Sequence, residues 1–262
     1  MQFFSRPDAY IGPCGDLRCT VSECRISGAP AFMRGLRALF ITDVHALPRT
    51  TASQIEALAA RAADARADIL LLGGDYADQA EPCKRLFEGL KRLGAPMGIY
   101  GVVGNNDREA FEDIGALRRI MSEAGVVPLI NESVSLSVGG GRLIVAGLDE
   151  YKHGHPDPAG LYPAGAGEGV YRVLLSHFPR RVSPMPDLML SGHTHGGQFN
   201  LLGITPYTIG FERLIHRNRA SHFISGLHRA DGGWVFVSKG IGASRIPLRV
   251  GVRPEMNLLV FD

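Results

Sequence analysis

The chain has 262 residues, of which 45% are hydrophobic and 21% are charged, and its formal net charge is +2 at pH 7. This composition is that of an ordinary globular protein with one sizeable core, and it excludes the extended basic surface of a dedicated nucleic-acid-binding protein. No stretch approaches the roughly 20 apolar residues that a membrane-spanning helix needs. We therefore expect a soluble, cytoplasmic chain, with peripheral contact to the inner membrane as an open alternative.

The N-terminal region carries no apolar run that would serve as an export signal, and no internal repeat or interdomain linker follows it. We expect one domain over residues 1–262, with the core motifs in 36–262 and an N-terminal strand or extension in 1–35. The cysteine spacing matches no zinc motif, so reduced thiols are expected, and a small redox or metal cluster is the alternative. The cysteines are Cys14, Cys19, Cys24 and Cys83.

The first half of the chain alternates between two kinds of pattern. Short apolar runs that end at Gly, Asn or Asp predict buried strands over residues 36–41, 68–72 and 98–103. Apolar residues at helical spacing predict helices over 52–66 and 82–93, and a third helix over about 109–124. Strands that alternate with helices in this way form parallel crossover units.

The second half is rich in strands. Short apolar runs separated by Gly-rich turns predict strands over 134–138, 142–146, 171–175 and 234–237. Both halves fit one α/β domain in which two sheets pack face to face as a β-sandwich, with helices outside in αββα layers.

Polar residues that can bind metal ions follow several of these predicted strands. Ligand sites of α/β sheets lie at the carboxyl edge of the strands, so these side chains are expected to converge. Carboxylate and amide oxygens suit divalent ions, while imidazoles favour Mn, Fe, Co, Ni or Zn over Ca or Mg. The candidate ligands are Asp43, His45, Asp75, Asn105, His177, His193 and His195.

The order of these motifs resembles that of the calcineurin-like metallophosphoesterases: Asp-x-His, Gly-Asp, Gly-Asn-His-Asp/Glu, a lone His and Gly-His-x-His. The resemblance implies two divalent ions, Mn²⁺ being favoured, that share Asp75 and bind a hydroxide that attacks phosphorus in line. One ion would take Asp43, His45, Asp75 and His195. The other would take Asp75, Asn105, His177 and His193.

The chain departs from the family pattern at Asn106, where most members have a histidine that contacts the phosphate and can protonate the leaving group. An amide donates a hydrogen bond but transfers no proton, so phosphodiesters or pyrophosphates are favoured over phosphomonoesters. Asp107 is expected to orient Asn106 or a metal ligand. His153 or His155 is an alternative proton donor, and Arg245 or Arg249 is expected to steady charge on the phosphoryl oxygens.

Gly-His-Thr-His-Gly-Gly-Gln198 and the tail around Arg249 resemble a narrower bacterial branch that includes enzymes similar to UDP-diacylglucosamine pyrophosphatases of lipid A synthesis. A nucleotide-linked lipid is therefore an alternative substrate to a generic phosphate ester, and a catalytically silent metal-binding scaffold is the alternative outside enzymes. Residues 201–204 are read as a hydrophobic substrate contact or as packing. Arg213, Arg217 and Arg219 are read as a basic lid or as a solvated loop.

Overall fold

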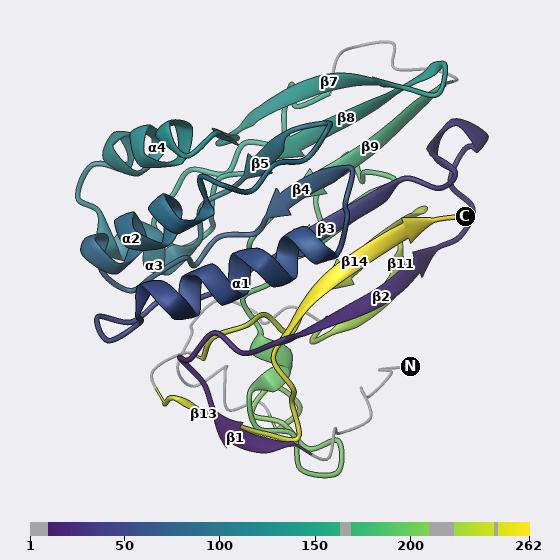
Figure 1. Cartoon of the computed structure of the whole chain (residues 1–262). Helices are drawn as coiled ribbons and strands as arrows, with labels where there is room; N and C mark the ends of the chain where they lie inside the picture. Colours follow the sequence, from purple (N-terminus) through teal and green to yellow (C-terminus); the bar gives the residue numbers. More distant parts are fainter. Residues whose placement is uncertain (1–9, 163–168, 210–222, 244–245) are drawn as a thin grey trace.

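Two six-stranded sheets packed face to face form the body of the computed structural model, which describes residues 10–162, 169–209, 223–243 and 246–262 (Figure 1). In spatial order, the first sheet contains β2 (Thr20–Ile26), β14 (Glu255–Phe261), β3 (Arg37–Ile41), β4 (Ile69–Leu72), β5 (Ile99–Gly101) and β6 (Val126–Pro128). The strands from β3 to β6 are parallel, β14 runs antiparallel to β3, and β2 is parallel to β14.

In the second sheet, a parallel centre is bordered by an antiparallel hairpin on each side. Its spatial order is β11 (Gly226–Ala230), β12 (Gly233–Val237), β10 (Leu188–Ser191), β9 (Val170–Leu175), β8 (Gly141–Gly147) and β7 (Glu132–Val138). A small separate sheet pairs β1 (Ile11–Pro13) with β13 (Leu248–Val250), antiparallel. Residues 11–13 and 20–26 are therefore paired with strands of the C-terminal segment.

Four helices accompany the first half of the chain: α1 (Ala52–Asp64), α2 (Ala80–Leu90), α3 (Asn105–Ala110) and α4 (Ile114–Glu123). A capping box begins α1, because Thr51 accepts from the Gln54 backbone while the Gln54 side chain accepts from the Thr51 backbone. Its apolar stripe packs with α2 and α4 against the outer face of the first sheet. The predicted α/β class, with two packed sheets flanked by helices, is confirmed.

Where the sequence predicted one helix over 109–124, the structure has two. Phe111 is extended, with φ −126° and ψ 116°, and the carboxylate of Asp113 then accepts from Gly115 to begin α4. The interruption carries no Gly or Pro, so the helical spacing of apolar residues gave no warning of it. The first of the two helices, α3, begins at Asn105, four residues earlier than predicted and shortly after β5.

Three apolar clusters fill the layers. The largest lies between the helices and the first sheet, the second between the two sheets, and the third on the other face of the second sheet. Within the described ranges, no helix is both long and apolar enough to cross a bilayer. The four cysteines are free thiols, and neither group of candidate metal ligands found in the described part of the chain includes one.

Candidate metal centre

Five strand ends from the two sheets deliver the candidate ligands to one edge of the sandwich. Asp43 and His45 follow β3, Asp75 follows β4, and Asn105 follows β5 at the start of α3. From the second sheet, His177 follows β9, and the Gly-His-Thr-His segment follows β10. The site is thus assembled between the sheets, and neither sheet alone contains it.

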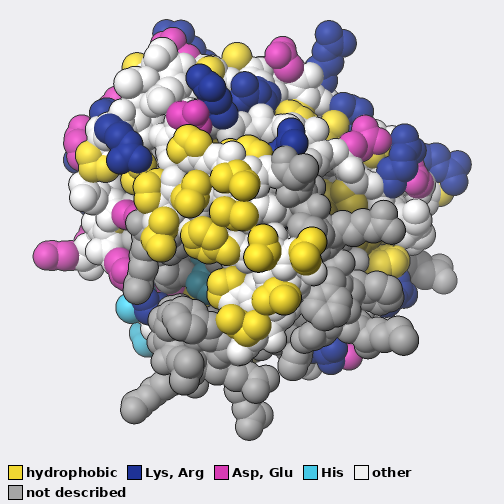
Figure 2. All heavy atoms as spheres, turned by 90° about the horizontal axis from the view of Figure 1, so that it is seen from below, with side chains coloured by type: hydrophobic (Ala, Val, Ile, Leu, Met, Phe, Trp, Pro, Cys, Tyr) yellow, Lys and Arg dark blue, Asp and Glu magenta, His cyan; other side chains and the backbone are white. Residues whose placement is uncertain are grey.

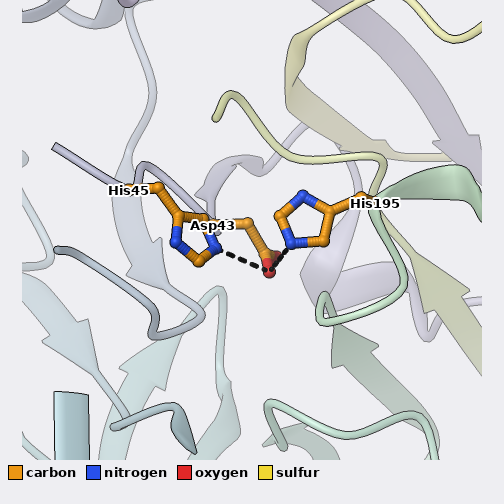
Figure 3. Close-up of side chains that lie close together, drawn as sticks. All are labelled: Asp43, His45 and His195. Atoms are coloured by element: carbon orange, nitrogen blue, oxygen red, sulfur yellow. Dashed lines mark ion pairs between the residues drawn. The ribbon is translucent and has the colours of Figure 1, made fainter. Parts of the chain in front are cut away.

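The first cluster joins Asp43, His45 and His195, whose ligand atoms lie within 4.8 Å of one another. His195 Nε2 lies 3.4 Å from Asp43 Oδ1, and His45 Nε2 lies 4.0 Å from the same oxygen (Figure 3). All three residues are buried. The Asp43 carboxylate is held by the Thr42 hydroxyl and by the backbone N–H of His193.

Asp75, His177 and His193 form the second cluster. Oδ2 of Asp75 lies 3.3 Å from His177 Nε2 and 3.5 Å from His45 Nε2, so this oxygen stands between the two clusters. The other oxygen, Oδ1, accepts from the backbone N–H of Asn106 at 2.9 Å. A carboxylate in this position is suited to bridge two metal ions.

Three buried ligand atoms have no hydrogen-bond partner among the described residues: His45 Nε2, His177 Nε2 and Asn105 Oδ1. The Nδ1 atoms of both histidines have hydrogen-bond partners: His177 Nδ1 donates to the Gly73 carbonyl, and His45 Nδ1 contacts the Asp78 carboxylate. These contacts direct a lone pair on each Nε2 toward Asp75. Such an arrangement is stable only with a cation between nitrogen and carboxylate, so the donor set fits divalent ions.

The close approach of carboxylates and imidazoles raises the pKa of His177 and lowers the pKa of Asp75. Burial lowers the pKa of His177, but the neighbouring Asp75 carboxylate outweighs it and raises the value to about 10. Burial likewise opposes ionisation of Asp75, yet His177 and His45 hold the pKa of this carboxyl below its ordinary range. Without metal ions, a proton on His177 therefore supplies the missing cation.

Asp107 holds the backbone of the loop that carries Asp75. Its side chain accepts from the backbone N–H groups of Asp75, Tyr76 and Gly104, each at 2.8 Å. Burial and the charge of Asp75 raise the pKa of Asp107 to about 7. The described hydrogen bonds of Asp107 go to the backbone, including that of Asp75, and none of them goes to the side chain of Asn106.

Asp78, which the sequence analysis did not single out, joins His45 of the first cluster to Asn106. Its Oδ1 lies 2.7 Å from His45 Nδ1 and accepts from Asn106 Nδ2 at 2.8 Å. The Asn105 amide in turn donates to Asn106 Oδ1. Because the side-chain amide N–H of Asn105 makes this hydrogen bond, the Oδ1 atom of Asn105 is left with no hydrogen-bond partner among the described residues. A chain of four side chains thus joins one candidate ligand to another.

Arg249 lies behind His195, which differs from the expected contact with a phosphoryl group. The guanidinium is fully buried, donates to the Gly242 carbonyl, and places Nη2 at 3.2 Å from His195 Nδ1. With Nε2 on a metal ion, Nδ1 would carry a proton that faces this guanidinium. The Nδ1 contact of His195 with Arg249 therefore suits metal binding through Nε2 less well than the Nδ1 contacts of His45 and His177 do. Arg245 lies outside the described residues.

The backbone is strained at several candidate ligands. Left-handed φ values between 44° and 67° occur at Asp43, His45, Asp75, His193 and His195. Non-glycine residues rarely adopt this region, and such strain gathers at functional sites. Packing is also close: a Cβ on Gly192 would lie 2.1 Å from Asp43 Oδ2. The sharp turns after the strands are what bring these side chains inward.

The other candidate histidines of the sequence analysis, His153 and His155, lie outside both candidate metal clusters. His153 pairs with Glu109, and the backbone of His155 donates to Asp149. The arginines at 213, 217 and 219 fall outside the described residues.

Comparison with known proteins identifies the family. The calcineurin-like phosphoesterase family model matches residues 36–197. The uncharacterized metallophosphoesterase YkoQ of Bacillus subtilis is 31% identical over 90% of this chain and 87% of its own length. Phosphodiesterase YaeI of Escherichia coli is 26% identical, over 85% and 81%. A "transmembrane protein with metallophosphoesterase domain" of Bos taurus is 27% identical, over 93% of this chain and 56% of that protein.

Proposed function

Because the chain belongs to the calcineurin-like phosphoesterases, a family of metallophosphoesterase hydrolases, we propose that it hydrolyses phosphodiester or pyrophosphate bonds at a binuclear metal centre. The observation that carries the proposal is the place of Asp75 Oδ2, between the partnerless nitrogens of His45 and His177. A bridging carboxylate with imidazoles on both sides is the arrangement that two ions about 4 Å apart require.

The ligands divide into two sets that share Asp75. One ion would be held by Asp43, His45, Asp75 and His195, and the other by Asp75, Asn105, His177 and His193. Bound there, the ions would supply a hydroxide at neutral pH and neutralise charge on the phosphoryl oxygens. Imidazole-rich ligation favours a transition metal, for which we propose Mn²⁺, with Fe, Zn, Co or Ni as alternatives.

The chain's own residues keep these ligands in place. Asp78 holds the ring of His45, Gly73 holds that of His177, and Asp107 fixes the backbone of Asp75. Such contacts determine the tautomer of a ligating histidine and keep it pointed at the metal. Because the ions would supply the attacking hydroxide, no covalent enzyme intermediate is expected and no side chain need act as a nucleophile.

Asn106 supports diesters and pyrophosphates over monoesters. Its amide contacts Asp78 and Asn105, and an amide cannot protonate a leaving group. General acid catalysis contributes roughly 10²–10⁴-fold, so its loss penalises a poor alkoxide leaving group most. Phosphates, nucleotides and aryl oxides leave with less help. The name of the Escherichia coli relative, a phosphodiesterase, agrees with this choice.

We propose a small phosphate ester as the substrate, and a nucleotide-linked lipid such as UDP-diacylglucosamine as its narrower form. The Gly-His-Thr-His-Gly-Gly-Gln198 segment supports the narrower form by resemblance alone. The four free thiols support a reducing compartment such as the cytoplasm.

The test is hydrolysis of bis(p-nitrophenyl) phosphate and p-nitrophenyl phosphate by metal-stripped protein reloaded with Mn²⁺. We expect Mn²⁺-dependent turnover that favours the diester, that His45→Ala abolishes, and that a matched His228→Gln variant retains. His228 contacts the Ser225 carbonyl and belongs to neither cluster. Turnover of UDP-diacylglucosamine without turnover of the generic diester would select the narrower substrate. Metal binding with no turnover of any of the three would replace the enzyme with a silent scaffold.

A further inference from the structure

Exposed aliphatic side chains gather on one face of the molecule (Figure 2). Among the described residues, nine large hydrophobic side chains are exposed, and seven of them belong to the segments that build this face. We call these seven the apolar face: Ile11, Leu201, Leu202, Ile204, Ile209, Ile246 and Leu248. Single exposed leucines are ordinary on protein surfaces, but a contiguous group marks a site of interaction.

Backbone contacts make these residues one surface. Pairing of β1 with β13 places Ile11 opposite Val250. The Asn200 backbone donates to the Val250 carbonyl, and Ile209 donates to Thr205 in the same loop. The segments are thus fixed side by side, and their exposure is a property of the fold.

The apolar face is also joined to the metal centre. Gln198, three residues after His195, donates from its side-chain amide to the carbonyls of Ile246 and Leu248. The 3-10 turn His195–Gly197 therefore runs directly into the loop that carries Leu201 and Leu202.

Leu202 is the most unusual member. Residues 201–204 form a tight hairpin in which Leu201 and Ile204 exchange backbone hydrogen bonds. Leu202 has φ 53° and Gly203 has φ 90°, the left-handed pair that normally selects Asn-Gly. The side chain is nevertheless a leucine, 87% exposed at the tip. The left-handed backbone and the exposure to water both disfavour leucine at this position. Burial of the Leu202 side chain when the face binds a partner would offset the cost of its exposure.

The composition of the face selects its partner. The exposed hydrophobic residues of the face are all Ile or Leu, aliphatic side chains that suit the acyl-chain boundary of a bilayer. The segments 10–14, 198–209 and 246–253 contain no Asp or Glu, and Arg253 is their exposed charge, beside the ring of Tyr10. Tyr10 and Tyr207 are half buried, as suits rings at the level of lipid headgroups.

We propose that the apolar face docks on a phospholipid bilayer. Its aliphatic side chains enter the boundary between headgroups and acyl chains, Leu202 leading, while Arg253 lies at the level of the phosphates. The metal centre is then held at the lipid surface, where phosphoesters of headgroups or of lipid-linked nucleotides are within reach. Docking depends on the surface alone, so it stands or falls independently of the proposed hydrolysis.

The test is flotation of the full chain with vesicles of equal parts phosphatidylcholine and phosphatidylglycerol. Leu202→Asn suits the left-handed turn, so it keeps the fold while it removes the apolar tip, and Ile11→Thr removes a side chain from another segment of the face. Each variant should lower the vesicle partition coefficient about tenfold, the effect of one lost leucine- or isoleucine-sized apolar contact. Val127→Thr, at an exposed position in β6, should bind as the wild type does.

Binding by the wild type that both variants weaken and Val127→Thr retains supports lipid docking. Metal-stripped protein should give the same result, which separates docking from hydrolysis. Absence of vesicle binding by the wild type, or equal binding by all variants, overturns the proposal. A wild-type dimer in sedimentation velocity that Leu202→Asn converts to monomer, with no vesicle binding, would assign the face to a second copy of the chain.

Discussion

Asp78 offers the sharpest test of how the ligands are held. Its Oδ1 contacts His45 Nδ1 at 2.7 Å and Asn106 Nδ2 at 2.8 Å. Burial lowers the pKa of His45, but the hydrogen bond that its ring donates to the Asp78 carboxylate and the nearby charge of Asp75 outweigh burial and raise this pKa above its usual value. Asp78→Asn keeps the shape of the side chain and removes its charge. His45 then becomes a weaker base and its ring is less firmly oriented.

The magnitude follows from the position of Asp78. Loss of a residue that orients a metal ligand lowers metal affinity roughly 10–100-fold. Because 41% of the Asp78 side chain is exposed, solvent screens its charge, and we expect the lower end, about tenfold or about 1.4 kcal/mol.

The assay is titration of metal-stripped protein with Mn²⁺, followed by the electron paramagnetic resonance signal of the free ion. Asp157→Asn is the matched control, because among the described residues that carboxylate accepts a hydrogen bond only from the nearby backbone of Ala159. Wild type and Asp157→Asn should bind alike, and Asp78→Asn more weakly. Equal affinity in all three proteins would refute the role assigned to Asp78.

Three further predictions follow from the same geometry. Since the pKa of His177 is raised from 6.5 to about 10, its proton stabilises the metal-free fold below about pH 6.5, and this contribution is lost as pH rises toward 10; urea unfolding should show the decline in wild type and a weaker one in His177→Ala. Gly192→Ala would place a Cβ 2.1 Å from Asp43 Oδ2 and should abolish Mn²⁺ binding measured by calorimetry, whereas Gly94→Ala, with open space around it, should not. Asn106→His restores a group able to protonate a leaving alkoxide, so the monoester-to-diester ratio of kcat should rise by up to roughly 10²-fold; an unchanged ratio in the Mn²⁺-loaded variant would remove the leaving-group argument.

The sequence could indicate that the candidate ligands gather at one edge, because each of them follows the end of a strand within four residues. Strands such as β3 and β4 are apolar at nearly every position, so their ends are visible, and parallel strands bring those ends together. The pairing of β2 with β14 could not be predicted in the same way, since it joins the two ends of the chain. No local pattern indicates which distant strand will be a neighbour.

The residues that support the ligands were also hidden from the sequence. Asp78 stands three positions after Asp75 with no motif of its own, and Arg249, for which the sequence suggested a phosphoryl contact, lies in the otherwise apolar segment 246–252. Their roles come from tertiary packing: one faces His45 across a loop, and the other is buried behind His195. The exposure of Leu202 was hidden as well, because it depends on a left-handed turn that a leucine rarely adopts.

The central claim is that Asp75 is shared by two metal ions, and metal stoichiometry tests it most directly. Metal-stripped wild type should take up two Mn²⁺ per chain, measured by elemental analysis after gel filtration, and hydrolysis of bis(p-nitrophenyl) phosphate should appear only as the second ion binds. Asp75→Asn should lose high-affinity binding of both ions and all turnover. One ion per chain in the active wild type, or two retained ions in Asp75→Asn, would contradict the account.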